Sequence, residues 1–391
     1  MERQPNPYRP GFNQAPATLA GRDDVLAAVR EALDVAALDS RTPRPVLLTG
    51  GRGVGKTVLL GEAAAIAAES HSWLTVPVEV RPHSSFTPQL VERLAAARDL
   101  YRQSARGRRV EVKAAKVRAA VLGFGAEVDL RRQPGADPAP ALPLETALSE
   151  AMEALAEHAA GLLVSIDELH LADRDELADL AATLQQHVPD NWPVVVMLAG
   201  LPSMRDPQRA VTYLERGEWH ILGLLDDTST RVALTAPAEG AGRPMTAAAA
   251  RLLADASGGY PYAIQVLGHH AWRASRDTAS IGVAAARAAA TAAQHDLAAG
   301  LYAARWQDAS PREREYLNAL AQLLAHSDQV TGGDVARQLG QPAAAVSYLR
   351  DRLIKKGTLF AESRQLRFPT PGLGEWILAT TEDPSQPRTR P

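Results

Sequence analysis

A glycine-rich stretch constrains the fold of this chain more than any other feature. The run GGRGVGKT, residues 50–57, joins the apolar segment 45–50 to the alanine-rich segment 56–70. Short apolar runs bounded by glycine or proline are typical of buried strands, and a longer alanine-rich segment is typical of a helix. Further apolar runs alternate with helical segments and lie at residues 74–80, 161–167, 193–200 and 218–225. Unbroken apolar strands joined by helices predict an α/β fold with a parallel sheet of about five strands covered on both faces.

The glycine-rich stretch has the spacing of a phosphate-binding loop. Gly50, Gly55, Lys56 and Thr57 satisfy the pattern G-x-x-x-x-G-K-[ST] between a predicted strand and a predicted helix. Such a loop surrounds a phosphate chain with backbone N–H groups, and the helix N-terminus adds partial positive charge. We expect Lys56 to reach the β- and γ-phosphates as a catalytic residue and Thr57 to hold Mg²⁺. The expected nucleotide contacts in the loop are Gly50, Gly51, Arg52, Gly53, Val54, Gly55, Lys56, Thr57 and Val58.

A second motif follows the apolar run at residues 161–167. Asp167 ends this run and Glu168 follows it directly. Beside a phosphate loop, Asp167 is expected to bind Mg²⁺ through water, and Glu168 to polarise the attacking water as a catalytic residue. The alternative is a helix cap, because Asp after a strand often begins a helix.

Composition and charge exclude several classes of protein. The 391 residues include no cysteine, which excludes disulfides, thiolate metal sites and cysteine nucleophiles. The formal net charge is -3, so any contact with nucleic acid must come from a local patch. No window supplies the roughly 18 consecutive apolar residues of a membrane span, and the polar N-terminus lacks the apolar core of a signal peptide. We therefore expect a soluble, cytoplasmic protein with no membrane contact.

The succession of segments predicts several parts. The α/β part contains a basic insertion, in which residues 101–118 hold seven Lys or Arg and residues 117–132 alternate around GFG as in a hairpin. The predicted parts are an extended arm at residues 1–18, an α/β nucleotide-binding domain at 19–227 with the insertion at 84–145, a helical lid at 228–305, a domain of three helices and a hairpin at 306–380, and a disordered tail at 381–391.

The domain at residues 306–380 resembles winged-helix DNA-binding domains. Ser310 and Thr331 are predicted helix caps, and Gly357 is predicted to end a third helix before a short hairpin. In the winged helix the third helix enters the major groove. The resemblance implies double-stranded DNA as a partner, contacted by Ser347, Tyr348, Arg350, Arg352, Lys355, Lys356, Arg364 and Arg367. The alternative is a packing or protein-interaction module, because helices often end in Lys or Arg for dipole reasons.

Over roughly residues 17–380, the chain resembles AAA+ ATPases of the origin-recognition-like group, with features of signal-transducing (STAND) ATPases. The segment LAGRDDVLAAVREAL is similar to the N-terminal motif of that group, in which Gly21 and Arg22 would lie beside the adenine. Residues 197–203 fall at the position of the sensor strand, and residues 257–268 fall in the lid. The resemblance implies ATP and Mg²⁺ as ligands and hydrolysis of ATP to ADP and phosphate.

Two departures from the group's pattern concern the residues that face the γ-phosphate. The sensor strand usually ends in a polar residue, but Ala199 and Gly200 occupy that region and leave Ser203 as the candidate. The lid usually supplies an arginine, but the matching turn is Gly259-Tyr260-Pro261. This turn is similar to the Gly-x-Pro of signal-transducing ATPases, in which Pro261 would pack near the adenine. These departures imply slow turnover.

The resemblance also implies an arginine that acts on a neighbouring subunit of a homo-oligomer. Arg216 is the candidate catalytic arginine, with Arg205 and Arg209 as alternatives, and a solvated surface arginine is the other interpretation. Together the motifs predict an ATP-dependent DNA-binding switch in initiation, transposition or transcriptional control. The rival prediction is a signalling scaffold that hydrolyses ATP slowly and recruits a protein partner.

Overall fold

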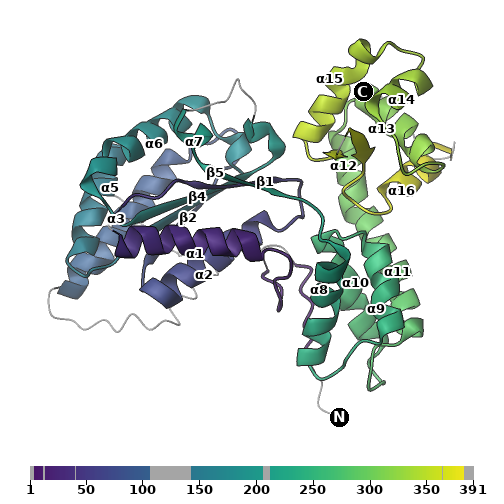
Figure 1. Cartoon of the computed structure of the whole chain (residues 1–391), viewed down its shortest axis with the longest axis horizontal. Coiled ribbons are helices and arrows are strands. Elements are labelled where there is room, and N and C mark those ends of the chain that lie inside the picture. Colours follow the sequence, from purple (N-terminus) through teal and green to yellow (C-terminus); the bar gives the residue numbers. More distant parts are fainter. Residues whose placement is uncertain are drawn as a thin grey trace, which may run out of the picture. The chain divides into compact units, whose positions relative to one another are not determined.

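The computed structural model describes residues 4–11, 14–39, 41–105, 142–205, 212–362 and 364–382. The chain divides into two compact units (Figure 1), and the first consists of residues 1–21, 50–55 and 223–391. The second unit consists of residues 22–49 and 56–222. The predicted GFG hairpin, most of the basic run, Arg209 and the end of the predicted tail lie outside the described residues.

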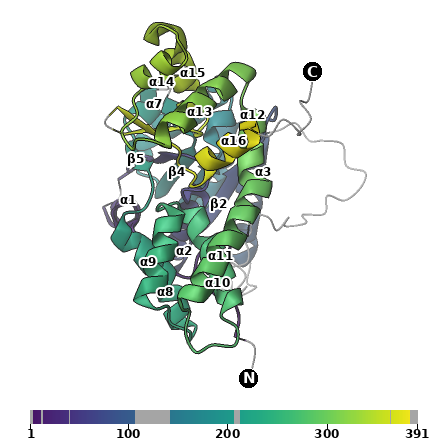
Figure 2. The ribbon, with the colours of Figure 1, turned by 90° about the vertical axis from the view of Figure 1, so that its right-hand side faces the viewer.

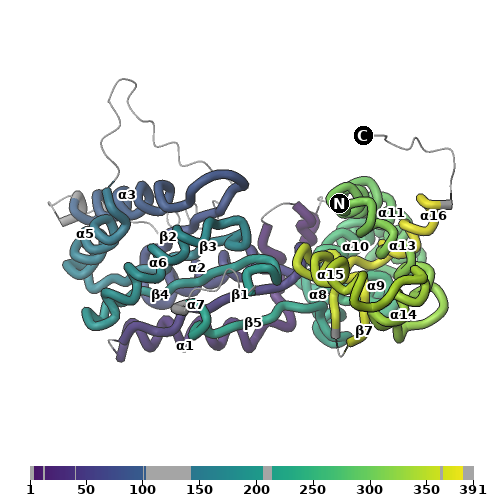
Figure 3. Tube along the Cα trace, turned by 90° about the horizontal axis from the view of Figure 1, so that it is seen from above, coloured from purple at the N-terminus to yellow at the C-terminus, as the bar shows by residue number. Residues whose placement is uncertain are grey.

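The second unit is built on a five-stranded sheet in the order β2-β3-β4-β1-β5 (Figure 3). The strand pairs β2–β3, β3–β4 and β1–β4 are parallel. Every residue of β1, β3 and β4 is buried, which is why these segments are apolar without alternation. The predicted fold class and all five predicted strands are confirmed. The strands are β1 (Val46–Gly50), β2 (Leu74–Glu79), β3 (Leu162–Asp167), β4 (Val194–Gly200) and β5 (Glu218–Leu222).

Helices cover both faces of this sheet (Figure 1). One face carries α1 (Asp23–Leu38) and α2 (Lys56–His71), which also contact each other. The other face carries α3 (Thr87–Ala105), α5 (Leu144–Ala156) and α6 (Arg174–Gln186), whose buried leucines share one core with β3 and β4. The first part of the predicted insertion is therefore the core helix α3. Short turns complete the unit: η1 (Leu169–Leu171), η2 (Val188–Asp190), η3 (Pro202–Arg205) and α7 (Thr212–Glu215).

The first unit begins with a group of packed helices (Figure 2). They are α8 (Asp227–Gly240), α9 (Ala247–Ser257), α10 (Pro261–Ala274) and α11 (Val283–Leu297). A π-helical turn, η5 (Ala298–Tyr302), continues α11 into α12 (Ala303–Asp308). The arm also belongs to this unit: Tyr8 is 2% exposed, and its hydroxyl donates to the Leu234 carbonyl of α8.

The C-terminal elements of this unit are three helices and an antiparallel hairpin, followed by a further helix. The predicted caps are confirmed, because Ser310 and Thr331 each form a capping box with the residue three positions later. The last helix, α16, was not predicted; it buries Leu373 and Ile377 and packs against α13. The elements are α13 (Pro311–Leu324), α14 (Gly332–Gln338), α15 (Ala343–Lys355), β6 (Phe360–Glu362), β7 (Gln365–Arg367) and α16 (Leu373–Glu382).

A search of the described residues for a helix with the length and apolarity of a bilayer span finds none.

Candidate active site

The two predicted metal ligands, Thr57 and Asp167, lie side by side in the second unit. Thr57 is the second residue of α2, and Asp167 is the last residue of β3 and only 3% exposed. The Thr57 hydroxyl donates to Asp167 Oδ2 over 2.5 Å, and Asp167 Oδ1 accepts the N–H of Glu168 at 2.8 Å. A hydroxyl and a carboxylate are the hard oxygen groups that Mg²⁺ prefers, with water and phosphate oxygens completing its coordination. The residues therefore fit this ion.

Glu168 has an unusual backbone conformation directly after the strand. Its φ of 54° lies in the left-handed region, which strains a residue other than glycine and is common at functional sites. Its carboxylate is part-exposed, and Oε2 lies 3.3 Å from Nδ1 of the buried His170. The same Nδ1 lies 3.4 Å from the N–H of Leu201, which follows β4. An imidazole protonated at Nδ1 donates to Glu168, whereas one that lacks this proton accepts from Leu201.

Lys56 and two glycines of the loop are defined by their burial and backbone conformation. Lys56 is the first residue of α2 and is 7% exposed. Gly53 and Gly55 have φ values of 79° and 99°, which side-chain-bearing residues rarely adopt. A Cβ atom on Gly53 would lie 2.0 Å from the Tyr260 hydroxyl oxygen. Gly53 is therefore required both by its backbone and by its neighbour.

Two residues outside the predicted site contact the loop within the first unit. The Tyr260 hydroxyl donates to the Arg52 carbonyl at 2.8 Å, and Arg305 Nη2 donates to the same carbonyl at 3.4 Å. Tyr260 is fully buried and Arg305 is 4% exposed. Burial raises the pKa of Tyr260, so its hydroxyl stays protonated and can donate. The sequence prediction named Pro261, the first residue of α10, and overlooked the neighbouring tyrosine.

The two residues predicted beside the adenine have separate environments. Gly21 has a φ of 66°, and a Cβ atom there would lie 2.6 Å from Ser229 Oγ in the same unit. Arg22, in the second unit, is 9% exposed, and its carbonyl accepts the N–H of Leu26 at the start of α1. Burial lowers the pKa of Arg22, and nearby Asp24 partly opposes this. Gly21 therefore has no room for a side chain next to Ser229, and Arg22 is buried.

The predicted sensor and arginine candidates lie at opposite ends of the sheet: Ser203 and Arg205 follow the carboxyl end of β4, and Arg216 precedes β5, near the start of β1. Strand β4, which ends at Ala199 and Gly200, lies between β1 and β3. Ser203 lies half-buried in η3, and the Arg205 guanidinium lies 5.4 Å from the Trp219 ring. Arg216 is exposed between α7 and β5, which fits a surface arginine as well as one that reaches a second subunit.

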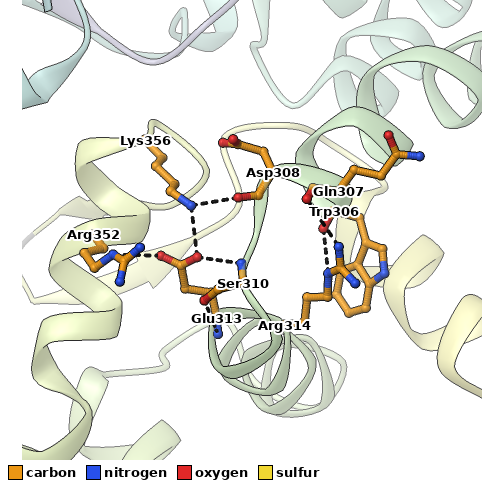
Figure 4. Close-up of polar contacts among 8 residues, drawn as sticks. All are labelled: Trp306, Gln307, Asp308, Ser310, Glu313, Arg314, Arg352 and Lys356. Atoms are coloured by element: carbon orange, nitrogen blue, oxygen red, sulfur yellow. Dashed lines mark hydrogen bonds and ion pairs between the residues drawn. The ribbon is translucent and has the colours of Figure 1, made fainter. Parts of the chain in front are cut away.

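The residues predicted to contact DNA divide into two sets. Arg352 and Lys356 are ion-paired with the fully buried Glu313, at 3.2 and 2.9 Å (Figure 4). Arg350 pairs with Asp351, and Ser347 donates to the Ala344 carbonyl. The exposed set is Tyr348, Lys355, Arg364 and Arg367. To bind the paired residues, DNA would have to compete with their partners in the protein.

The N-terminal half of the chain matches a known protein family. Residues 18–197 match the family model described as AAA ATPase domain. This segment is an AAA ATPase domain. Residues 299–377, from η5 to α16, match a separate model described as Domain of unknown function (DUF8462). None of the curated proteins matches the chain.

The comparison with solved structures concerns the fold alone. A Walker-type ATPase of Pyrococcus abyssi is 15% identical, with a TM-score of 0.60 and coverage of 92% of this chain and 96% of that one. The RuvB Holliday junction branch migration motor of Thermotoga maritima is 15% identical, with coverage of 91% and 96% and a TM-score of 0.47. The ORC1 protein of Aeropyrum pernix in complex with DNA is 18% identical, with coverage of 94% of both chains and a TM-score of 0.44. Of these three, the Pyrococcus structure superimposes well enough to support a shared fold.

Proposed function

We propose that this protein is an ATP-dependent DNA-binding switch that hydrolyses ATP slowly. ATP and Mg²⁺ bind at the phosphate loop of the AAA ATPase domain, and the nucleotide state controls the C-terminal elements at residues 306–380, which we interpret as a winged helix. The single observation that carries the nucleotide half is the hydrogen bond between Thr57 and Asp167, because it joins the two motifs that must share one metal ion.

Each polar group at this site has a distinct part in the proposed hydrolysis. Lys56 neutralises charge on the β- and γ-phosphates, Thr57 ligates Mg²⁺ directly, and Asp167 holds it through water. The metal ion, when bound, spreads the charge that develops on the phosphate oxygens. Glu168 orients and polarises the attacking water. An imidazole protonated at Nδ1 would hold the Glu168 carboxylate, and this contact favours slow turnover, because a carboxylate held by a neighbour must be released before it can activate water.

Arg216 is proposed to act on a neighbouring subunit of a homo-oligomer. Its exposure at the surface between α7 and β5 supports this role. An arginine supplied in this way stabilises the negative charge of the transition state. If Arg216 has this role, the rate of ATP hydrolysis per protein molecule should rise with protein concentration in the wild type. It should not rise in Arg216→Ala.

The DNA-binding half of the proposal rests on the exposed set of basic residues. Lys355, Arg364 and Arg367 are exposed and carry positive charge, and Tyr348 of α15 is 42% exposed. Basic groups at a helix and a hairpin are suited to phosphate contacts across a groove. Initiation, transposition or transcriptional control are the processes in which such a switch would act.

A second function, a signalling scaffold with slow turnover that recruits a protein partner, has specific support as well. Arg352 and Lys356, two of the cations expected to bind DNA, are ion-paired with Glu313. The Gly259-Tyr260-Pro261 turn is similar to that of signal-transducing ATPases. In this function the C-terminal elements would serve protein packing.

ATP turnover with and without duplex DNA tests both functions. We expect DNA to stimulate the wild-type protein, and Lys56→Ala to abolish both the basal and the stimulated rates. Turnover that is indifferent to DNA, together with undetectable binding of duplex DNA at low salt in both nucleotide states, would contradict the DNA switch and favour the scaffold. Binding that weakens steeply with salt would indicate phosphate contacts, because counterion release produces this slope.

A further inference from the structure

The peptide group between Arg52 and Gly53 is held from behind by two buried side chains. Its carbonyl accepts the Tyr260 hydroxyl at 2.8 Å and Arg305 Nη2 at 3.4 Å. A carbonyl oxygen has two lone pairs, so both donors can be accommodated at once. Neither donor belongs to the phosphate-loop motif.

Holding this carbonyl also orients an N–H group of the loop. The peptide bond is planar and trans, so the N–H of Gly53 points away from the Arg52 carbonyl and therefore away from Tyr260 and Arg305. The N–H groups of a phosphate loop are its phosphate ligands. Because an added Cβ on Gly53 would lie 2.0 Å from the Tyr260 oxygen, the tyrosine sits directly behind this peptide.

Arg305 connects the same peptide to the end of α15. Its Nη1 donates to the Gly357 carbonyl at 3.1 Å, while Nη2 reaches the Arg52 carbonyl. Its Nε is buried and has no hydrogen-bond partner among the described residues. A buried cation is costly unless its donors are satisfied, so the two carbonyls help to keep this guanidinium in place.

The short helix that carries Arg305 is firmly joined to the C-terminal helices (Figure 4). Lys356, just after α15, donates to the Asp308 carbonyl at 2.8 Å and to Glu313. From the other side, Arg314 of α13 donates to the Trp306 and Gln307 carbonyls at 2.8 and 3.2 Å. These bonds tie α12 to α13 and α15, so a displacement of these helices displaces Arg305 with them.

We propose that Tyr260 and Arg305 are positioning residues that hold the Arg52–Gly53 peptide in its phosphate-binding orientation, and that Arg305 makes nucleotide affinity depend on the position of α12 and α15. The inference rests on the proposed binding of ATP at the loop. The coupling runs both ways, because a link between nucleotide affinity and helix position must also let nucleotide shift the helices.

Nucleotide affinity of matched variants tests the positioning role. Tyr260→Phe keeps the ring and removes one hydrogen bond, and Arg305→Met keeps much of the side-chain volume and removes both. We expect each to raise the dissociation constant of a fluorescent ATP analogue on the order of tenfold, with KM rising similarly and kcat changing less than about threefold. Arg305→Lys restores one donor and should recover part of the affinity.

Two variants of nearby arginines serve as controls. Arg314→Met removes a guanidinium that bonds to carbonyls of the α12–α13 junction, and Arg312→Met removes an exposed guanidinium of α13. Both should bind the analogue within about twofold of wild type. Thermal unfolding without nucleotide reports whether Arg305→Met is folded, and Tyr260→Phe supplies the test if it is not.

The outcomes separate this inference from the function on which it rests. If wild type binds the analogue and Lys56→Ala does not, but Tyr260→Phe and Arg305→Met bind as wild type does, the positioning role is wrong and ATP binding stands. If wild type does not bind the analogue, the proposed function itself is wrong. Saturating ATP should also change hydrogen exchange at residues 353–359 in wild type and Arg314→Met but not in Arg305→Met; an unchanged exchange in wild type would contradict the coupling.

Discussion

Asp167 and Glu313 are both carboxylates buried in this chain, yet they have different partners. Asp167 is 3% exposed and accepts a hydroxyl and a peptide N–H, from Thr57 and Glu168. Glu313 is 0% exposed and is surrounded by the Ser310 N–H and two cations, Lys356 and Arg352. The first set of partners is neutral and leaves the negative charge available to a metal ion. The second set neutralises the charge within the protein.

Burial of a carboxylate therefore does not by itself indicate catalysis. Glu313 completes the capping box of α13 and receives Lys356 and Arg352 from the end of α15, so it joins two helices. Asp167 ends its strand at the carboxyl end of the parallel sheet, where the phosphate loop also begins. We therefore expect substitutions at Asp167 to affect turnover and substitutions at Glu313 to affect stability.

The largest effect is expected for Asp167→Asn. The amide keeps the shape of the side chain but cannot balance the charge of a metal ion, so ATP turnover should fall at least about 100-fold. The unfolding midpoint in urea should change little, because the contacts of Asp167 are with neutral groups. Steady-state phosphate release and urea titration measure the two quantities. A variant that keeps its turnover would remove Asp167 from the site.

Glu313→Gln should show the opposite pattern. It removes the charge that neutralises Arg352 and Lys356, and weakens the cap of α13, so we expect a loss of about 2 kcal/mol in the free energy of unfolding. Basal ATP turnover at a temperature at which the protein stays folded should remain within about threefold of wild type. Glu315 is an exposed residue of the same helix, so Glu315→Gln is the matched control and should leave the free energy of unfolding nearly unchanged. Equal losses in the two variants would mean that the buried ion pairs do not hold the helices together.

The pH dependence of stability gives a finer test of Glu313. Burial alone would raise its pKa, but the Ser310 N–H, Lys356 and the Ser310 hydroxyl outweigh this and lower the pKa below its usual 4.5. A carboxyl with a lowered folded-state pKa stabilises the fold above its unfolded-state pKa, and this stabilisation is lost as the pH falls through the folded-state value. The stability difference between wild type and Glu313→Gln should therefore be full near neutral pH and shrink below pH 4.5. A constant difference, measured by urea titration over this range, would contradict the charge-based account.

Much of the α/β domain, and the starts of two C-terminal helices, could be predicted from the sequence because their determinants are local. Strands buried on both faces are unbroken apolar runs, and the caps Ser310 and Thr331 act on N–H groups of their own helices. The pairing of Thr57 with Asp167 followed from two motifs whose chemistry requires a common metal ion.

The contacts that could not be predicted join residues far apart in the chain. Glu313 meets Lys356 across 43 positions, and Tyr260 reaches Arg52 across 208. No local pattern specifies such pairs, since they depend on how the helices pack. Helix α16 was not predicted for a related reason. Its buried residues, Leu373 and Ile377, form a recognisable apolar face only once the helix packs against α13.

The smallest effects are expected in DNA binding. Basic residues that are ion-paired with Glu313 should contribute less to the affinity for DNA than basic residues that are not. Arg364 and Arg367 are exposed on the hairpin, so replacing both with Ala should weaken binding of duplex DNA on the order of tenfold and reduce its salt dependence. Arg352 and Lys356 are held by a buried carboxylate, so the double Ala variant should weaken binding less than about threefold once compared at equal folded fraction. Fluorescence anisotropy at several salt concentrations measures both. If the second pair mattered more than the first, DNA would have to displace these cations from Glu313, and the carboxylate would then regulate DNA binding in addition to stabilising the helices.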